Sequence, residues 1–246
     1  MKAPAQDQTR LLQVQARDTA LHQLAHKRAR LPQLAGLRAV AAKQAAASEE
    51  LEVARVEARD EQRELTRLED DIAKVEARAV RDKARLDSGG GLSRELQALQ
   101  QDLEILARRR ARLEDEALEA MERVESGRSG IASLEASLAA LDAEAAGLEA
   151  ELAAATAELD RAAAAEAVQR AAAAEGLDAG LVKLYERLRQ RLGGVGAAAL
   201  SQGRCGGCGF QLSASELAAI KSLGADEVAR CEECTRILVR GEDSGL

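Results

Sequence analysis

Two interleaved series of apolar residues, each repeating every seven positions, constrain this chain more than any other feature. They stay in phase for about ten heptads, and Arg110 and Gly127 are the only strong departures. Their members are Leu92, Leu99, Leu106, Leu113, Ala120, Gly127, Leu134, Leu141, Leu148, Ala155 and Ala162, and Leu96, Leu103, Arg110, Ala117, Val124, Ile131, Leu138, Ala145, Leu152 and Leu159. A period of 3.5 residues predicts a helix that supercoils around a partner. At about 1.5 Å per residue, a helix of about 80 residues is on the order of 120 Å long.

The partner of this helix lies earlier in the chain. A matching seam, interrupted by Gln44, Glu61 and Asp82, contains Leu37, Val40, Ala47, Leu51, Ala54, Ala58, Leu65, Leu68, Ile72, Val75, Ala79 and Leu86. Between the two seams, the segment 87–93 has three consecutive glycines, which break a helix, followed by Ser93, which can cap the next one. The fold class we predict is therefore mainly α, a long antiparallel coiled-coil helical hairpin with its tip near 87–93.

The first arm contains a proline that divides it. An interior proline lacks a backbone N–H and clashes with the preceding turn, so we expect a kink or break near Pro32. Folding the chain about residue 90 places Pro32 opposite roughly residue 148, which leaves residues 7–31 a partner in the second helix. Their apolar face comprises Leu11, Val14, Leu21, Leu24 and Leu31. Gly127 and Gly130 are the expected weak point of the second helix.

Composition and charge narrow the functional classes. Aromatic residues make up only 1% of the chain, too few for a large globular core. The net charge of −7 is uneven: residues 1–92 carry 17 basic and 15 acidic side chains, residues 93–180 carry 9 and 19, and residues 181–246 carry 9 and 8. An acidic second helix repels a phosphate backbone, so any nucleic-acid contact is expected on the C-terminal part or on local basic faces of the first arm.

The four cysteines of the chain form two CxxC pairs, Cys205 with Cys208 and Cys231 with Cys234. Each pair can chelate from a tight turn, and together they complete a tetrahedral thiolate shell for one structural Zn²⁺. A redox dithiol, an iron–sulfur cluster and a catalytic zinc are the alternatives. A redox CxxC normally begins a helix in an α/β domain, which is missing here, and four thiolates leave zinc no open position for water.

The 22 residues between the two pairs carry signals for a short helix. Ser213 and Glu216 form a capping box, Leu212 and Leu217 occupy the staple positions, and Gly224 provides a stop. Residues 228–230 and 236–240 are typical of ribbon strands. Gly209 suits the positive φ that follows a CxxC turn, and Thr235 holds the equivalent place in the second pair.

These residues divide the chain into three parts. We expect the hairpin over 1–175, a connecting helix and strand over 176–202, and the zinc ribbon over 203–246. Because the hairpin and ribbon are expected to share little core, metal loss should unfold the ribbon and leave most helicity intact.

The motifs resemble a known family, the bacterial C4-type zinc-ribbon proteins with an N-terminal coiled-coil hairpin. The resemblance rests on Tyr185-Glu-Arg-Leu-Arg189, Gly203-Arg-Cys-Gly-Gly-Cys208, Leu212-Ser-Ala-Ser-Glu-Leu217 and Cys231-Glu-Glu-Cys-Thr-Arg-Ile-Leu-Val-Arg240, together with the leucine-rich hairpin. Family members usually have glycine where this chain has Thr235, and the tip here is richer in glycine. The resemblance implies a non-enzymatic protein that binds nucleic acid or protein.

The leading functional hypothesis is that the ribbon contacts RNA or DNA through its basic side chains, with the hairpin as a spacer or partner arm. The candidate residues are Arg204, Lys221, Arg230, Arg236 and Arg240, and only Tyr185 and Phe210 are available to stack on bases. The alternative is a protein–protein adaptor or chaperone-like scaffold that uses the coiled coil. No apolar run reaches the ~20 residues of a membrane span, and the paired cysteines favour a reducing compartment. We therefore expect a cytoplasmic protein with no membrane partner and no small-molecule substrate.

Overall fold

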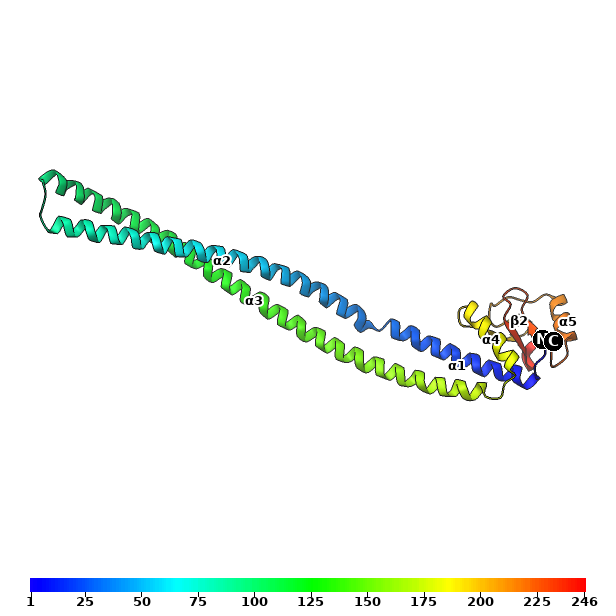
Figure 1. Cartoon of the computed structure of the whole chain (residues 1–246). Helices are drawn as coiled ribbons and strands as arrows, with labels where there is room; N and C mark the ends of the chain where they lie inside the picture. The colour runs from blue at the N-terminus through cyan, green and yellow to red at the C-terminus, as the bar shows by residue number, and fades with distance from the viewer. The chain divides into compact units, whose positions relative to one another are not determined.

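A computed structural model describes residues 1–246. The elements follow the chain order shown in Figure 1: α1 (Ala5–Ala29), α2 (Pro32–Asp87), α3 (Ser93–Ala174), α4 (Ala179–Arg191), β1 (Ala197–Ser201), β2 (Arg204–Cys205), α5 (Ala214–Ser222), β3 (Ala229–Arg230), β4 (Ile237–Arg240) and the 3₁₀ helix η1 (Glu242–Ser244). They form two compact units, one of residues 35–149 and one of residues 1–34 with 150–246. The predicted mainly α hairpin followed by a small ribbon is confirmed.

The unit of residues 35–149 is an antiparallel pair made by most of α2 and the first two thirds of α3. The predicted seam residues supply its core, a cluster of Leu65, Leu68, Ala117, Ala120 and Val124. Polar side chains cross between the helices on either side of the seam, as where Arg123 Nε donates to Glu61 Oε2 at 2.7 Å. Narrow seams of alanine and leucine bury little area per residue, so the length of the contact stabilises the pair.

The tip of the hairpin lies where the three glycines predict it. Helix α2 ends at Asp87, α3 begins at Ser93, and Gly89 and Gly91 adopt φ values of +64° and +156°. Ser93 does not cap α3 as expected, because it is already the first helical residue. Glu95 does so instead: its Oε2 accepts from the Leu92 N–H at 3.1 Å, so a carboxylate stabilises the free N–H groups and positive end of the helix.

The two predicted weak points behave differently. The first arm is broken before Pro32, because α1 ends at Ala29 and α2 begins at the proline. The first turn of a helix needs no N–H donor from its first residue, so proline is tolerated there. Gly127 and Gly130 do not interrupt α3, which is continuous from Ser93 to Ala174. A Cβ on Gly127 would lie 3.4 Å from the Ala58 Cβ, whereas no atom lies within 4 Å of a Cβ on Gly130. A glycine costs a helix about 1 kcal/mol relative to alanine, which weakens the helix without ending it.

The second unit contains a four-stranded sheet in the order β2-β1-β4-β3. Strand β1 pairs antiparallel with β2 and parallel with β4, with Ala197 opposite Ile237, and β3 pairs antiparallel with β4. The predicted strands at 228–230 and 236–240 are therefore present. Strand β1 belongs to the segment assigned to the connection, so the boundary expected at residue 203 falls inside one sheet.

The sheet has an apolar cluster on each face. Alternation along β4 sends Ile237 and Val239 toward α1 and α4, and Leu238 toward the cysteines and α5. On the helical side, Leu11 and Val14 of α1 pack with residues of α4 and the sheet in one buried cluster. The expectation that the hairpin and ribbon share little core is wrong, because α1 supplies part of the core beneath the ribbon sheet.

A buried polar network joins the same elements. Tyr185 of α4 is fully buried, and its hydroxyl donates to Asp18 Oδ2 at 2.6 Å. Asp18 Oδ1 accepts from Arg170 Nε of α3 at 2.8 Å, and Gln15 Oε1 accepts from the Gly196 N–H at 2.8 Å. Burial and the neighbouring Asp18 carboxylate raise the pKa of Tyr185, which keeps the phenol protonated as a donor.

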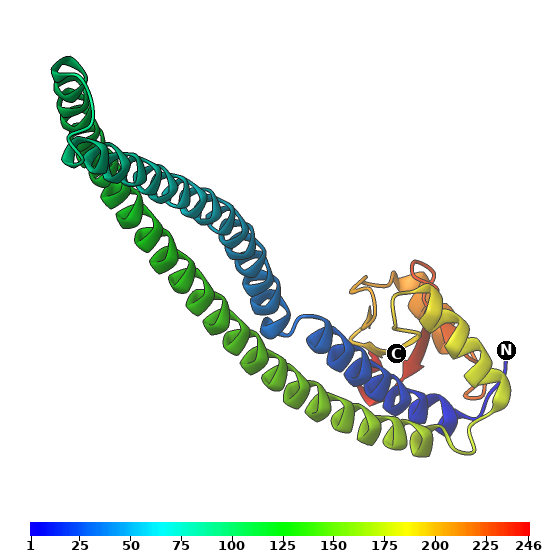
Figure 2. The same cartoon turned by 60° about the vertical axis from the view of Figure 1, so that its left-hand side comes forward.

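The first residues of the chain extend this unit further. The Ala3 N–H donates to Asp226 O at 2.7 Å, and the Val228 N–H donates to Met1 O at 3.0 Å. This short pairing lies beside the start of β3 and ties the beginning of α1 to the ribbon. Figure 2 shows the N-terminus and α1, in blue, next to the C-terminal elements, in yellow to red. A membrane-spanning helix requires about 20 apolar residues in succession, and none of the helices contains such a stretch.

Candidate metal centre

The two CxxC turns have the same local geometry. In the first, the Gly209 N–H donates to Cys205 O at 2.8 Å and the Cys205 N–H to Phe210 O at 2.9 Å. In the second, the Thr235 N–H donates to Cys231 O at 2.9 Å and the Cys231 N–H to Arg236 O at 3.0 Å. Gly209 and Thr235 both adopt positive φ, +75° and +65°. The backbone conformation anticipated from the sequence is therefore present in both knuckles, including the one where threonine must adopt it.

The knuckles bring all four cysteine sulfurs together, within 4.8 Å of one another. Cys205 Sγ lies 3.8 Å from Cys234 Sγ, and Cys208 Sγ lies 3.9 Å from Cys231 Sγ. A tetrahedral zinc ion with Zn–S bonds of about 2.3 Å places its sulfurs about 3.8 Å apart. The donor set and spacing fit a single zinc ion, and four thiolates would complete its coordination.

The sulfurs differ in their surroundings. Cys205 and Cys231 are buried, and Cys208 is exposed. Burial raises the pKa of the Cys205 and Cys231 thiols, because a thiolate in an apolar environment loses its hydration. Burial opposes ionisation of Cys234 as well, but donors of Arg236, its backbone N–H first, lower the pKa of that thiol. A divalent cation would favour the thiolate form at all four positions.

The insert between the knuckles forms the expected helix. In α5, Ser213 Oγ accepts from the Glu216 N–H at 3.3 Å, and Glu216 Oε2 accepts from the Ser213 N–H at 2.6 Å. This reciprocal capping box lowers the pKa of Glu216, through its hydrogen bonds with Ser213. Leu212 and Ile220 then pack with Cys205 and Cys231 in the cluster under the metal site.

The structure places the five basic candidates in different roles. Arg236 donates from Nε to Val195 O at 2.9 Å and from Nη2 to Leu192 O at 3.0 Å. Arg240 donates to carbonyls at the end of α5 and in the loop after it, including Gly224 and Glu227, both at 2.8 Å. These two side chains hold backbone carbonyls in place inside the fold.

The other three candidates are exposed. Arg204 Nη1 donates to Gly209 O at 3.0 Å, and Arg230 Nε donates to Thr235 O at 3.0 Å. Lys221 lies on the exposed face of α5. Of the two aromatic residues, Tyr185 is fully buried and cannot stack on a base, and Phe210 is 44% exposed beside the first knuckle.

Sequence reasoning missed the arginine contacts with the knuckles and the network around Asp18. A signal for the first was available, since the same residue type precedes both CxxC pairs, at Arg204 and Arg230. The second had no local signal, because Gln15, Asp18, Arg170 and Tyr185 belong to three helices distant in sequence.

Comparison with known proteins agrees with this architecture. Residues 14–193 match the model of the CT398-like coiled coil hairpin domain, and residues 204–238 match that of the C4-type zinc ribbon domain. An uncharacterized protein of Mycobacterium tuberculosis is 38% identical over 242 residues, which cover 98% of each chain.

Solved structures extend the similarity to three dimensions. A protein of Mycobacterium smegmatis has a TM-score of 0.86 at 32% identity and covers 98% of this chain and 100% of its own. CT398 from Chlamydia trachomatis has a TM-score of 0.71 at 19% identity, covering 96% and 98%, and shares the fold. With the hairpin, the ribbon and the four gathered sulfurs accounted for, the chain belongs to the family of CT398-like coiled-coil hairpin proteins with a C4-type zinc ribbon.

Proposed function

We propose that this protein is a non-enzymatic adaptor whose hairpin binds an acidic amphipathic helix of a partner protein. The carrying observation is a pair of grooves with apolar floors on one side of the seam. The zinc ion would serve the fold, because four thiolate ligands leave no position for a substrate. Reduced cysteines at such a site favour a cytoplasmic location.

The proposed surface, the groove face, consists of the residues that directly follow seam positions. In two antiparallel helices, the residue after each seam position turns toward the same side of the pair. Val80, Leu118 and Met121 occupy such positions and are 68%, 60% and 52% exposed. Exposed apolar residues scattered singly are ordinary, and Val53 and Ile105 are 53% and 54% exposed on the opposite side, so the case for this face rests on its grooves.

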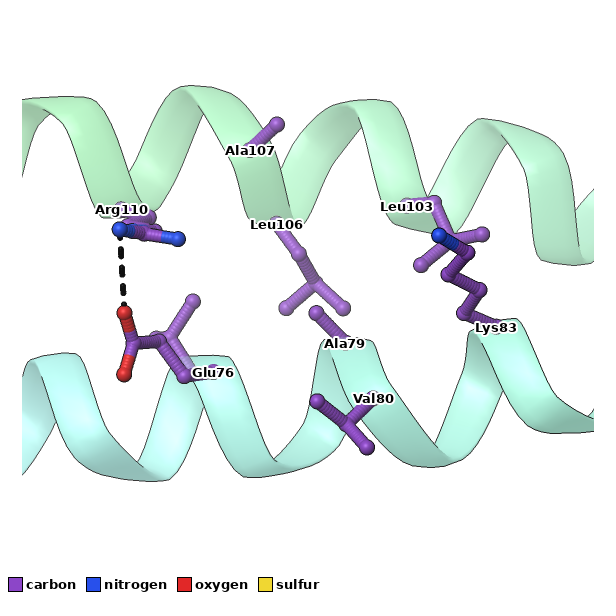
Figure 3. Close-up of a pocket in the computed structure, with 9 residues that line it drawn as sticks. Glu76, Ala79, Val80, Lys83, Leu103, Leu106, Ala107 and Arg110 are labelled. Carbon is purple, nitrogen blue, oxygen red and sulfur yellow. Dashed lines mark ion pairs between the residues drawn. The ribbon is translucent and has the colours of Figure 1, made fainter.

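A groove toward the tip lies on this face. It has a volume of about 450 Å³, and its apolar lining comes from small and branched side chains of both helices, Val75, Ala79, Val80, Leu103, Leu106 and Ala107. Figure 3 shows Ala79 and Leu106 pointing toward each other across the groove, with the Glu76–Arg110 ion pair at one end and Lys83 toward the other. Such a lining suits apolar side chains spaced along one face of a helix.

A second groove on the same face explains why the proposed partner is acidic. Its floor is Ala58, Val124 and Ile131, its polar rim is Gln62 with three arginines, and no acidic residue lines it. The arginines are Arg55, Arg59 and Arg128. The opposite side of the hairpin at this level carries Glu57, Asp60 and Glu61 beside Arg123. At this level the arginine rim can pair with acidic side chains of a partner, as Arg55 already does with Glu52 and Glu135 of this chain.

The test compares two double variants with equal changes in charge. Leu118→Glu with Met121→Glu places acidic groups on the groove face, and Val53→Glu with Val56→Glu places them at positions of similar exposure away from it. Tagged full-length proteins are crosslinked in cells, and captured proteins are quantified by mass spectrometry. Each captured protein is then purified, and its affinity for both variants is measured by calorimetry.

The adaptor function would be supported by a partner whose affinity falls at least tenfold for the Leu118→Glu, Met121→Glu variant and is unchanged for the Val53→Glu, Val56→Glu control. Equal binding by the wild type and both variants would contradict it. Circular dichroism should be unchanged in both variants, because all four positions are more than half exposed.

Nucleic-acid binding by the ribbon is the second candidate function. It is supported by the exposed Arg204, Lys221 and Arg230 and by exposed Phe210. Zinc with four thiolates carries −2, which works against a phosphate backbone. The test is binding to mixed-sequence RNA and DNA across a salt series, with Lys221→Glu and Phe210→Ala as variants that leave the carbonyl contacts of the arginines intact. Salt-sensitive binding weakened by these variants would favour this function over the adaptor.

A further inference from the structure

The arginines that precede the two CxxC pairs make equivalent contacts. Arg204 precedes Cys205, and its side chain donates to the carbonyl of Gly209, the residue after Cys208. Arg230 precedes Cys231, and its side chain donates to the carbonyl of Thr235, the residue after Cys234. Both distances are 3.0 Å, and both contacts span five residues. In each half of the site, an arginine side chain therefore bridges the two ends of the CxxC turn.

The carbonyl groups that accept these hydrogen bonds belong to Gly209 and Thr235, the residues with positive φ. Each of these residues also donates its N–H to the first cysteine of its knuckle, at 2.8 Å for Gly209 and 2.9 Å for Thr235. The peptide groups on both sides of the positive-φ residue are thus fixed, one by the backbone and one by an arginine. Both cysteines of a knuckle precede this residue, so fixing it closes the turn that sets the separation and direction of their two sulfurs.

The second knuckle has the greater need for this contact. Positive φ is unfavourable for a residue with a branched Cβ, whereas glycine adopts it without a steric penalty. Thr235 has φ +65° and Gly209 has φ +75°. A hydrogen bond to the Thr235 carbonyl stabilises the knuckle in the conformation that the side chain of Thr235 opposes.

We propose that Arg204 and Arg230 are paired positioning residues of the zinc site, which hold the two knuckles closed by hydrogen bonds and slow the loss of the ion. Groups outside the ligand shell that orient the ligands commonly affect metal affinity by about 10–100-fold. The effect at Arg230 should exceed that at Arg204, because Thr235 opens more readily than Gly209.

The experiment measures zinc release from the full-length, zinc-loaded chain. Excess 4-(2-pyridylazo)resorcinol captures the ion, and its absorbance gives the release rate. The variants are Arg204→Met, Arg230→Met and their combination, with Lys221→Met as a control that removes one exposed positive charge from the same unit. Cobalt-loaded samples report the geometry of the site through the thiolate-to-cobalt absorption band, which a change confined to the surface would leave in place.

A further variant separates the hydrogen bond from the charge. Arg230 donates through Nε, and a lysine has a methylene at that place in the side chain, so Arg230→Lys keeps the charge and removes the donor. We expect Arg230→Lys to release zinc about as fast as Arg230→Met. Release at the wild-type rate would overturn the proposed hydrogen-bond role.

The expected release rates rise about threefold for Arg204→Met, about tenfold for Arg230→Met and 10–100-fold for the combination. Lys221→Met should release zinc at the wild-type rate, and the cobalt band should shift only in the arginine variants. Wild-type release by both methionine variants would overturn the proposal, as would equal acceleration in the lysine control.

Discussion

The two units of this protein are stabilised by contacts of different range. Between residues 35 and 149, the core is a seam of alanine, leucine and valine, and most polar contacts are exposed ion pairs such as Arg123 with Glu61. In the other unit, residues more than 150 positions apart share one core, as Leu11 does with Tyr185, and a buried carboxylate is hydrogen-bonded from two helices. The hairpin unit can therefore loosen locally, whereas the ribbon unit should respond as a whole.

Removal of zinc is the change expected to affect the two units most differently. Chelating zinc should remove on the order of 10 kcal/mol of apparent stabilisation from the ribbon. Since α1 and α4 pack on the ribbon sheet, hydrogen exchange should accelerate in Gln8–Asp18 and in α4 as well as in the strands. Residues 60–75 and 110–125 should keep their protection, as measured by mass spectrometry. Unchanged exchange in α1 would mean that its pairing with α3 is sufficient by itself.

A glycine substitution in the ribbon unit should be costly. A Cβ on Gly196 would lie 2.7 Å from the Tyr185 carbonyl oxygen and 2.8 Å from the tyrosine ring, so Gly196→Ala forces α4 away from β1. We expect a loss of about 2–3 kcal/mol in the free energy of unfolding, measured by urea denaturation. A loss below about 0.5 kcal/mol would show that this junction yields easily.

The buried network should contribute less than the glycine contact. Tyr185→Phe removes the hydroxyl that donates to Asp18 Oδ2. The Asp18 carboxylate then keeps its hydrogen bond from Arg170 Nε at 2.8 Å. The expected cost is about 1–2 kcal/mol, because a buried acceptor loses one partner without loss of packing volume. Urea denaturation of the Tyr185→Phe and wild-type chains gives the difference directly. A neutral result would assign the stabilisation to the Asp18–Arg170 pair alone.

The smallest effect lies in the hairpin unit and has the opposite sign. No atom lies within 4 Å of a Cβ placed on Gly130, so Gly130→Ala gains helix propensity without a steric penalty. We expect stabilisation of about 1 kcal/mol and a higher helical signal on heating. The matched variant Gly147→Ala, which is equally open, should behave alike. Destabilisation by both would mean that α3 requires flexibility that its contacts do not reveal.

Local patterns predicted the elements whose structure depends on near neighbours. The Leu92 and Leu96 repeats gave the long helix and its seam, the three glycines gave the tip, and Ser213 with Glu216 gave the cap of α5. The spacing of the four cysteines was enough to expect one metal site, because a tetrahedral ion tolerates few arrangements of two CxxC turns.

The same patterns were weaker guides to the roles of charged residues. Arg236 and Arg240 were predicted to contact nucleic acid, yet both side chains donate to backbone carbonyls distant in sequence. Sequence gives the charge of an arginine but not which of its donors are already used. Gly127 and Gly130 were expected to be the weak point of α3, and the helix is continuous through both of them.

The sequence by itself determined the long helices, the hairpin tip and the four-cysteine site, because heptad period, turn residues and ligand spacing act over short stretches of chain. Only the tertiary structure decided that α1 belongs to the core of the ribbon, that β1 pairs with β4, and that Asp18 is buried beside Tyr185. Those contacts join segments up to about 220 residues apart. Each of these contacts depends on which surfaces pack together when the chain folds, and a local sequence period or spacing does not specify that packing.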